Sequence, residues 1–350
     1  LVPLVDAGQG GDLLERVKSV RRQLASSLGF IMPPVRVRDV ISLKPGEYVL
    51  RIRGVEVARG EVMTGRLLAV SSVPGQPEIE GIKTKDPAFG VDAVWIMESQ
   101  KLIAEASGYT VVTPSSVVAT HLAETVRRNG SRLFGRKECQ ELLDTLKESN
   151  PVLVSEVVPN LLNLGQVHKV LQYLLDERVP IRDLVTILET LGDMAPYEKD
   201  LAKLGEAVRK ALGAQLCADL VDPEGNLNLI VLDYGLEQAL KEDASDSGRS
   251  DPADSIELWS RFMDAAGAEI ARVAQLGVTP TLVCTDELRP FLRGLLLPVY
   301  KELSLLARGE LTDQVKLKTL AVVRLQDEGQ TVRSGVNGAG LRTYPPRARA

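Results

Sequence analysis

The sequence predicts a multi-domain α+β protein with a mixed N-terminal part, a helical bundle and a C-terminal α/β part. Its 350 residues suffice for roughly two to three domains of ordinary size. The apolar pattern is almost entirely helical from 134 to 213, and strand and helix patterns alternate after it, as in α/β domains. Short strand patterns between about 65 and 113 flank a loop rich in proline and glycine, which indicates a small unit of its own.

The N-terminal part begins with an amphipathic helix, GDLLERVKSVRRQLASSLGF, with Asp12 as its N-cap and Gly29 just past its end. The following EYVLRIRGVEVARGEV alternates apolar and charged residues, and Gly54 changes the parity. Two half-buried strands joined by a turn or a bulge are the predicted structure.

The stretch TPSSVVATHLAETVRRNG predicts a second amphipathic helix, capped by Ser115 or Ser116. Its apolar stripe consists of Val118, Leu122 and Val126. At about 100° per residue, Thr120 lies roughly 200° around the helix from Val118. Thr120 and Glu124 are therefore predicted to point away from the stripe, and Thr120 to be accessible.

The region from 134 to 213 predicts closely packed short helices. One helix lies in VPNLLNLGQVHKVLQYLLDE, and the next lies in VPIRDLVTILETLGD with Pro180 near its start and Gly192 at its end. Beyond the bundle, NLNLIVLDY, TPTLVCTD and VKLKTLAVVRL predict strands. The helices between them are SIELWSRFMDAAGAEIARVAQLG and ELRPFLRGLLLPVYKEL, the latter interrupted by Pro290. An acidic, serine-rich loop is predicted at 241–255, and a disordered tail from about 326.

Composition excludes several classes of protein. With 44% hydrophobic and 25% charged residues and a net charge of -5, the chain is typical of soluble globular proteins rather than of nucleic-acid binders. Cys139, Cys217 and Cys284 are widely spaced, which argues against disulfides and thiolate metal sites and favours a reducing compartment. No apolar run is long enough to span a bilayer. Because the chain begins at Leu1 without a signal sequence, we expect it to be a fragment of a longer protein.

Patterns that carry catalytic chemistry are missing. His121 and His168 stand far apart without a partner at metal-ligand spacing, so both are predicted to be partly buried structural residues. There is no P-loop and no nucleophile elbow, and the carboxylates are spread along helix faces. The sequence therefore predicts a protein that is not an enzyme and needs no cofactor or metal.

Several long blocks resemble, in order, the cytoplasmic domain of the FlhA family of flagellar export-gate proteins. They include LVPLVDAGQGGDLLERVKSVRRQLASSLGFIMPPVRVRDV, LKPGEYVLRIRGVEVARGE, DPAFGVDAVWI, GYTVVTPSSVVATHL, LFGRKECQELLD and VPNLLNLGQVHKVLQYLLDERVPIRDLVTILETL. The resemblance is dense to about 213 and looser to about 325, through TPTLVCTDELRPFLRGLLLP and LSLLARGEL. The homologous export gate of virulence injectisomes is the alternative, although GVEVARGE is closer to the flagellar branch.

The resemblance implies four subdomains beneath an absent membrane-spanning half, assembled as a ring of nine at the cytoplasmic face of the bacterial inner membrane. The implied first subdomain is discontinuous, at 1–64 and 114–133, and the second is inserted into it at 65–113. A helical third subdomain follows at 134–213, an α/β fourth at 214–325 and a tail at 326–350. Its implied partners are flagellar export chaperones with late substrates and other export components, including the ATPase complex. The ring would pass unfolded cargo to a membrane channel.

The family's chaperone-docking dimple lies between the first two subdomains, and its positions match Asp86, Phe89 and Thr120. The resemblance thus implies that Phe89 forms part of a contact surface with Asp86 as a polar neighbour at the rim. The alternative is that Phe89 folds inward to hold the turn while Asp86 caps it before Pro87.

Arg182 is a further candidate, because it could pair with Asp183 or reach a neighbouring subunit in the ring. Two competing classes stay open at this stage. An enzyme would require a deep polar cleft with converging ionisable groups. A purely structural ring component would be favoured if the region around Phe89 were flat and polar.

Overall fold

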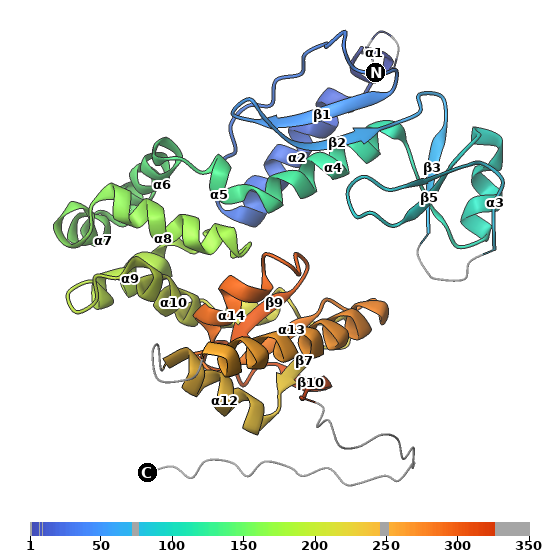
Figure 1. The fold of residues 1–350 in the computed structure, drawn as a ribbon. Coiled ribbons are helices and arrows are strands. Elements are labelled where there is room, and N and C mark those ends of the chain that lie inside the picture. The colour runs from blue at the N-terminus through green and yellow to red at the C-terminus, as the bar shows by residue number, and fades with distance from the viewer. Residues whose placement is uncertain (1, 7, 9, 72–76, 246–251, 326–350) are drawn as a thin grey trace, which may run out of the picture. The chain divides into compact units, whose positions relative to one another are not determined.

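The computed structural model describes residues 2–6, 8, 10–71, 77–245 and 252–325, and Figure 1 shows their fold. The chain forms two compact units. The first comprises residues 1–219 together with 309–314, and the second comprises 220–308 and the chain from 315 onward. Because 309–314 packs with the first unit, the chain passes between the units three times. The predicted tail at 326–350 lies outside the described residues.

The first unit opens with the short helix α1 (Val2–Val5) and the predicted amphipathic helix α2 (Leu13–Leu28). Gly29 ends α2 in the left-handed conformation, as predicted, whereas the carboxylate of Asp12 pairs with Arg16 instead of capping the helix. Strands β1 (Glu47–Ile52) and β2 (Val55–Glu61) are antiparallel. Arg53 and Gly54 both have positive φ between them, which confirms the predicted turn.

A four-stranded antiparallel sheet follows, with strand order β4-β5-β3-β6. Its strands are β3 (Leu67–Val70), β4 (Ile82–Lys85), β5 (Asp92–Ile96) and β6 (Thr110–Val112). The short helix α3 (Lys101–Ala106) follows a single 3-10 turn at Glu98–Gln100. A small core of Leu67, Ala69, Val94, Ile96 and Ala104 lies between sheet and helix. All these elements fall within 65–113, although the four-subdomain boundaries stay a prediction.

Helix α4 (Pro114–Arg128) returns the chain from this sheet to α2, against which it packs. The predicted cap was wrong: Thr113 accepts the hydrogen bond from the Ser116 backbone N–H, because Pro114 already occupies the first helical turn. The predicted apolar stripe is confirmed, since Val118, Leu122 and Val126 are all buried.

The rest of the first unit is helical, as predicted. Its elements are α5 (Gly130–Leu133), α6 (Arg136–Ser149), α7 (Pro151–Ser155), a π-helical segment (Glu156–Leu161), α8 (Leu164–Asp176), α9 (Leu184–Met194), α10 (Leu201–Ala211) and α11 (Gly213–Ala218). The predicted bounds of α9 were wrong. Asp183 caps the Thr186 N–H, which moves the start past Pro180, and Gly192 lies inside the helix because burial against its neighbours carries the helix onward.

The second unit confirms the predicted α/β part as a parallel sheet of order β10-β7-β8-β9. Its elements are β7 (Asn226–Leu232), α12 (Tyr234–Ser245), α13 (Pro252–Gln275), β8 (Thr281–Cys284), α14 (Arg289–Leu296), β9 (Ser304–Ala307), a 3-10 turn (Arg308–Glu310) and β10 (Lys316–Val323). The apolar core lies around Ile230, Leu240, Phe262, Leu282 and Leu292.

Two predictions for this unit were wrong. Pro290 does not interrupt a helix but lies in the first turn of α14, where its missing N–H leaves no broken hydrogen bond. The predicted loop at 241–255 is partly helical, because α12 extends to Ser245 and α13 starts at Pro252. Residues 246–251 lie outside the described residues.

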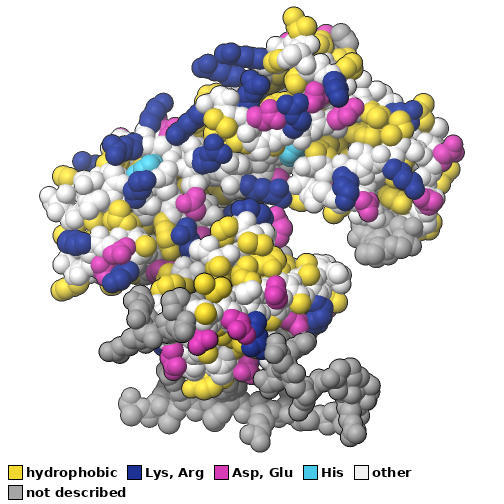
Figure 2. Space-filling model, viewed as in Figure 1, with side chains coloured by type: hydrophobic (Ala, Val, Ile, Leu, Met, Phe, Trp, Pro, Cys, Tyr) yellow, Lys and Arg dark blue, Asp and Glu magenta, His cyan; other side chains and the backbone are white. Residues whose placement is uncertain are grey.

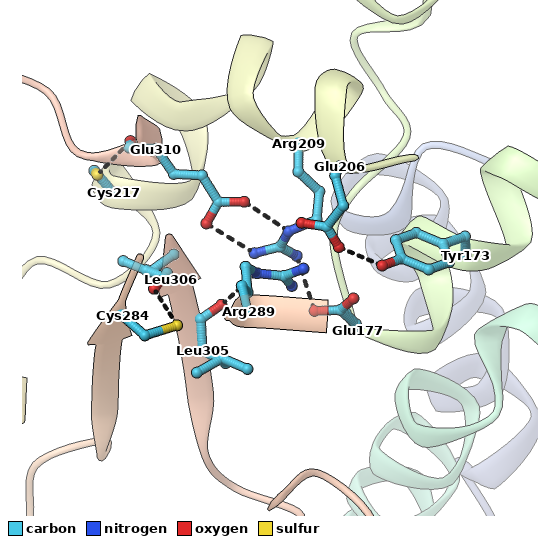
Figure 3. Close-up of polar contacts among 10 residues, drawn as sticks. All are labelled: Tyr173, Glu177, Glu206, Arg209, Cys217, Cys284, Arg289, Leu305, Leu306 and Glu310. Atoms are coloured by element: carbon cyan, nitrogen blue, oxygen red, sulfur yellow. Dashed lines mark hydrogen bonds and ion pairs between the residues drawn. The ribbon is translucent and has the colours of Figure 1, made fainter. Parts of the chain in front are cut away.

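A buried ion network holds the returning segment 309–314 to the helical part of the first unit (Figure 3). The Nε of Arg209 on α10 lies 2.7 Å from Oε1 of Glu310, and its Nη1 lies 3.2 Å from Oε2 of Glu177 at the end of α8. The three side chains expose 3%, 1% and 4% of their surface, respectively. The Sγ of Cys217 contacts the Glu310 carbonyl oxygen at 3.4 Å.

Candidate functional site

The turn between β4 and β5 is held by its own backbone and by one buried carboxylate. The Asp86 N–H donates to the Val91 carbonyl at 2.8 Å, and the Gly90 N–H donates to the Asp86 carbonyl at 2.8 Å. Asp86 is only 6% exposed, and its Oδ2 accepts from the Ala88 N–H at 3.3 Å. Gly90 has a φ of +72°, which a residue with a side chain adopts only with strain. The turn is therefore a well-defined platform.

Phe89 is presented outward by this turn. Ala88 takes the inward position with 2% exposure, whereas Phe89 exposes 57% of its surface and the neighbouring Val91 40%. The inward alternative for Phe89 is therefore wrong, because the space beneath the turn is filled by the smaller side chain. The expected place of Asp86 at the rim is also wrong, since a carboxylate that accepts the turn's own N–H groups must lie beneath it.

Thr120 is exposed on α4, as predicted, and the next residue points inward. His121 is 6% exposed, and its Nδ1 lies 2.8 Å from the hydroxyl of Tyr48 on β1. The charge of Asp86 in the turn acts on His121, which follows Thr120 on α4. In Figure 2, hydrophobic side chains gather where the inserted sheet adjoins the start of α4. Electrostatics thus link Asp86, three residues before Phe89, to the helix that exposes Thr120.

The buried polar groups beneath the turn have shifted pKa values. Burial raises the pKa of Asp86, although the N–H groups of Ala88 and Phe89 act in the opposite direction. Burial also lowers the pKa of His121, partly offset by the negative charge of Asp86. The pKa of Tyr48 is strongly raised, chiefly by burial and also by Asp86. Sequence patterns could not identify Tyr48, because its partner is 73 positions away.

Arg182 lies elsewhere in the first unit and contacts its own chain. Its Nη2 lies 3.6 Å from Oδ1 of Asp219, and its Nε donates to Oε1 of Gln215 at 3.3 Å. Pairing with Asp183 was one of two predicted possibilities, and it is wrong because the Asp183 carboxylate caps α9 instead. The contact of Arg182 with a neighbouring subunit stays a prediction.

The remaining candidate chemistry is structural. His168 is 8% exposed, with its Nε2 3.1 Å from the Phe134 carbonyl oxygen, so both histidines are buried structural residues, more deeply than predicted. All three cysteines are buried and unbridged. Within the described ranges, no group of three or more metal-ligating side chains comes together. None of the helices described is long and apolar enough to cross a membrane.

An open groove of about 340 Å³ lies on the second unit, lined in part by Asp222, Glu224, Asn228 and Lys318. Its best-placed carboxylate is already used: Asp222 accepts from the backbone N–H groups of Asn226 and Glu224 and from the Asn228 side chain. These bonds, led by that from Asn226, lower the pKa of Asp222. In this groove the Asp222 carboxylate therefore serves to hold the chain that leads into β7.

The fold and the site together define a multi-domain α+β protein whose candidate site is an exposed apolar turn on a rigid support. Its sequence matches the FHIPEP family over residues 1–316. The chain belongs to this family.

Among its relatives, the flagellar biosynthesis protein FlhA of Bacillus subtilis (strain 168) is 41% identical over 327 residues, covering 92% of this chain and 48% of the relative. FlhA of Escherichia coli (strain K12) is 38% identical over 323 residues, covering 92% of this chain and 46% of the relative. The chain thus spans about half the length of the curated relatives it matches.

Solved structures confirm the fold class. The Chlamydia pneumoniae CdsV protein has a TM-score of 0.76 at 22% identity, covering 88% of this chain and 90% of the other. The nonameric EPEC SctV-C has a TM-score of 0.71 at 19% identity, and the match covers 89% of this chain and 94% of the SctV-C chain. The structure of the Chlamydia pneumoniae CdsV and CdsO complex gives a TM-score of 0.73 at 23% identity, and the match covers 89% of this chain and 90% of the matched chain.

Proposed function

We propose that this chain is the cytoplasmic docking platform of a flagellar type III protein export gate. It binds export chaperones carrying late substrates and passes the unfolded substrates toward a membrane channel. The observation that carries the proposal is the outward Phe89 on a turn held by a buried carboxylate, beside the helix that exposes Thr120. A rigidly presented aromatic side chain is typical of the centre of a protein-protein contact.

The similarity to named proteins supports the flagellar form of this proposal. The relatives at 41% and 38% identity are flagellar biosynthesis proteins, whereas the solved structures quoted are at most 23% identical. The proposed location is the cytoplasmic face of the bacterial inner membrane, with the membrane-spanning part in the other half of the full-length protein. The proposed role is binding and transfer, without catalysis or a cofactor.

Replacing Phe89 with alanine tests the docking surface. We expect Phe89→Ala to weaken binding of a flagellar export chaperone in complex with its late substrate by about tenfold or more, equivalent to about 1.4 kcal/mol. The midpoint of thermal unfolding should stay unchanged, because Phe89 is 57% exposed and contributes little to the core. Isothermal titration calorimetry of the 350-residue chain and a melting curve provide the two readouts.

Phe291→Ala is the matched control, because Phe291 is similarly exposed at 51% but belongs to α14 of the second unit. It should leave the chaperone affinity unchanged. Unchanged binding by Phe89→Ala together with a lower melting temperature would show that Phe89 serves stability and that chaperones dock elsewhere.

Self-association into a ring of nine is proposed for the full-length protein, with Arg182 as a contact between subunits. The detached chain should be mostly monomeric in dilute solution, because the membrane half supplies much of the effective concentration of subunits. Light scattering across a dilution series checks this expectation, and a stable nonamer of the isolated chain would contradict it. Arg182→Ala should reduce association at high concentration if Arg182 exchanges Asp219 for a partner.

A further inference from the structure

A buried polar cluster lies beneath the proposed docking surface. Tyr48 from β1, His121 from α4 and Asp86 from the turn are 7%, 6% and 6% exposed, respectively. The Tyr48 hydroxyl lies 2.8 Å from Nδ1 of His121, and the two rings meet edge to face with centroids 5.7 Å apart. Three titratable side chains from separate parts of the first unit are thus enclosed at one place.

The fold makes room for this cluster. Tyr48 pairs with Gly60 across the β1–β2 ladder, and a Cβ at Gly60 would come within 2.5 Å of the Tyr48 hydroxyl oxygen. A side chain at position 60 would therefore displace the hydroxyl from His121. The strand pairing holds Tyr48, Tyr48 holds His121, and α4 carries Thr120 immediately before His121.

The cluster continues to the turn through Asp86. The Asp86 carboxylate accepts from the Ala88 N–H, and its charge acts on both His121 and Tyr48. A buried carboxylate is stable only where donors and dipoles compensate its charge, so Asp86 depends on the N–H groups of its own turn and, in this proposal, also on the dipoles of Tyr48 and His121. The direction of Phe89 depends in turn on Asp86, three residues before it.

We propose that Tyr48 and His121 are positioning residues for the docking surface, which hold Asp86 and through it the turn that presents Phe89. This inference rests on the proposed docking function. Neither side chain contacts the partner in this proposal, because both are buried. Their effect is to keep the Phe89 turn and the exposed face of α4 in one arrangement, so that binding does not have to order them.

Protonation of His121 should disturb this arrangement. In this proposal the neutral ring carries its proton on Nε2 and accepts a hydrogen bond from the Tyr48 hydroxyl at Nδ1, whereas the protonated ring has an N–H on both nitrogens. Two donors would then face each other, and the hydroxyl would have to rotate away inside a closed cluster. The charged groups that act on His121 are Asp86 from the turn and Arg128 from its own helix. Among the cationic side chains of the elements packed against α4, Arg21 donates to the Met32 carbonyl, Arg132 to Asn129 and Arg59 to Glu56. Arg16 and Lys18 of α2 pair with Asp12 and Glu15.

The sign of the pH effect follows from burial. His121 has its pKa lowered from 6.5, so it is neutral at neutral pH and takes up a proton only at a cost as the pH falls below 6.5. Docking of the partner buries His121 further and makes its protonation still less favourable. The affinity for the partner should therefore fall as the pH falls. The pKa of Asp86 is raised from 3.8, and its protonation acts in the opposite direction at lower pH.

The test compares Tyr48→Phe and His121→Gln with the unmodified 350-residue chain. Binding of a flagellar export chaperone in complex with its late substrate is measured between about pH 7.5 and pH 5.5. The unmodified chain should lose affinity across this range. Tyr48→Phe should bind about three- to tenfold more weakly at the upper pH, with its pH midpoint shifted upward, because the neutral ring has lost its donor. His121→Gln should show little pH dependence.

His168→Gln is the matched control, because His168 is also buried and hydrogen-bonded but lies on α8 against Phe134. It should lower the melting temperature while the pH profile of docking keeps its shape. Docking profiles of Tyr48→Phe and His121→Gln that coincide with that of the unmodified chain would overturn the inference and leave the proposed function standing.

Hydrogen exchange of the turn provides a readout that needs no partner. The Gly90 N–H is bonded to the Asp86 carbonyl, so its exchange reports whether the turn is held. It should exchange faster in Tyr48→Phe than in the unmodified chain or His168→Gln. If the unmodified chain bound no chaperone, the proposed function would fail, but faster exchange in Tyr48→Phe alone would still support positioning. Equal exchange in all variants would refute it.

Discussion

Replacing Arg209 with methionine is expected to destabilise the first unit by about 3–5 kcal/mol. The guanidinium contacts Glu310 and Glu177, and all three side chains are almost fully buried. Methionine fills much of the same space but leaves two buried carboxylates without the cation that both contact. The loss is a large fraction of the roughly 5–15 kcal/mol that stabilises a typical domain.

Tryptophan fluorescence can isolate this effect. The chain has two tryptophans, Trp95 in the first unit and Trp259 in the second. In a Trp259→Phe background, urea unfolding reports on Trp95, which is 2% exposed on β5. A lower denaturation midpoint at unchanged slope would show the predicted loss of stability.

The surface variant Arg59→Met is the matched control, because the Arg59 side chain is 50% exposed where it pairs with Glu47 and Glu56. It should change the midpoint little, since exposed ion pairs contribute little to stability. Adding Glu310→Gln to Arg209→Met should recover part of the loss, because it removes the charge of one of the two carboxylates that contacted Arg209. An effect of Arg209→Met no larger than that of Arg59→Met would contradict the assigned role of the network.

Replacing Gly29 with alanine is expected to have the second largest effect. Gly29 has a φ of +89°, and a Cβ there would lie 2.3 Å from the backbone nitrogen of Arg182. The left-handed conformation alone costs alanine about 1–2 kcal/mol. The clash is with backbone rather than with a flexible side chain, so either the end of α2 or the chain at Arg182 must move. The Ile181 N–H bond to the Leu28 carbonyl, 2.9 Å long, lies at the same place and would be strained.

Gly54→Ala separates the two contributions, since Gly54 also has positive φ, at +84°, but a Cβ there would meet no atom within 4 Å. Gly54→Ala should lose only the stability that corresponds to the cost of the left-handed backbone conformation. Urea unfolding followed by Trp95 should therefore show a clearly larger loss for Gly29→Ala than for Gly54→Ala. Equal losses of stability in the two variants would mean that the backbone at Arg182 moves away from the added Cβ without a measurable loss of stability.

The sequence alone predicts the elements whose patterns are local. The α2 helix with its Gly29 terminus, the β1–β2 turn at Gly54 and the stripe of α4 all follow from hydrophobic periodicity and backbone preference, which act within a few residues. The α/β architecture of the second unit was predicted from its alternating strands and helices, whereas the parallel pairing of its strands was seen only in the structure. Strand β9 was missed, because its short apolar run shows no alternation that distinguishes a strand from the end of a helix.

For the candidate site, the sequence identified the residues but not their roles. Resemblance singled out Asp86, Phe89 and Thr120, and helical periodicity placed Thr120 on an exposed face. Whether Phe89 or Ala88 fills the space beneath the turn depends on what lies there, so no local pattern could decide it. The same limit applies to Asp86, whose carboxylate is buried beneath the turn, where it accepts from the Ala88 N–H.

Tertiary structure alone decided the contacts between residues distant in the chain. Tyr48 meets His121 across 73 positions, Gly29 meets Arg182, and Glu310 returns across 101 positions to Arg209. Each contact depends on packing between elements, which a periodic pattern does not encode. The sequence by itself determined most of the elements, their apolar faces and the family. The fold determined which polar groups are buried together, because burial and pairing are properties of the assembled chain.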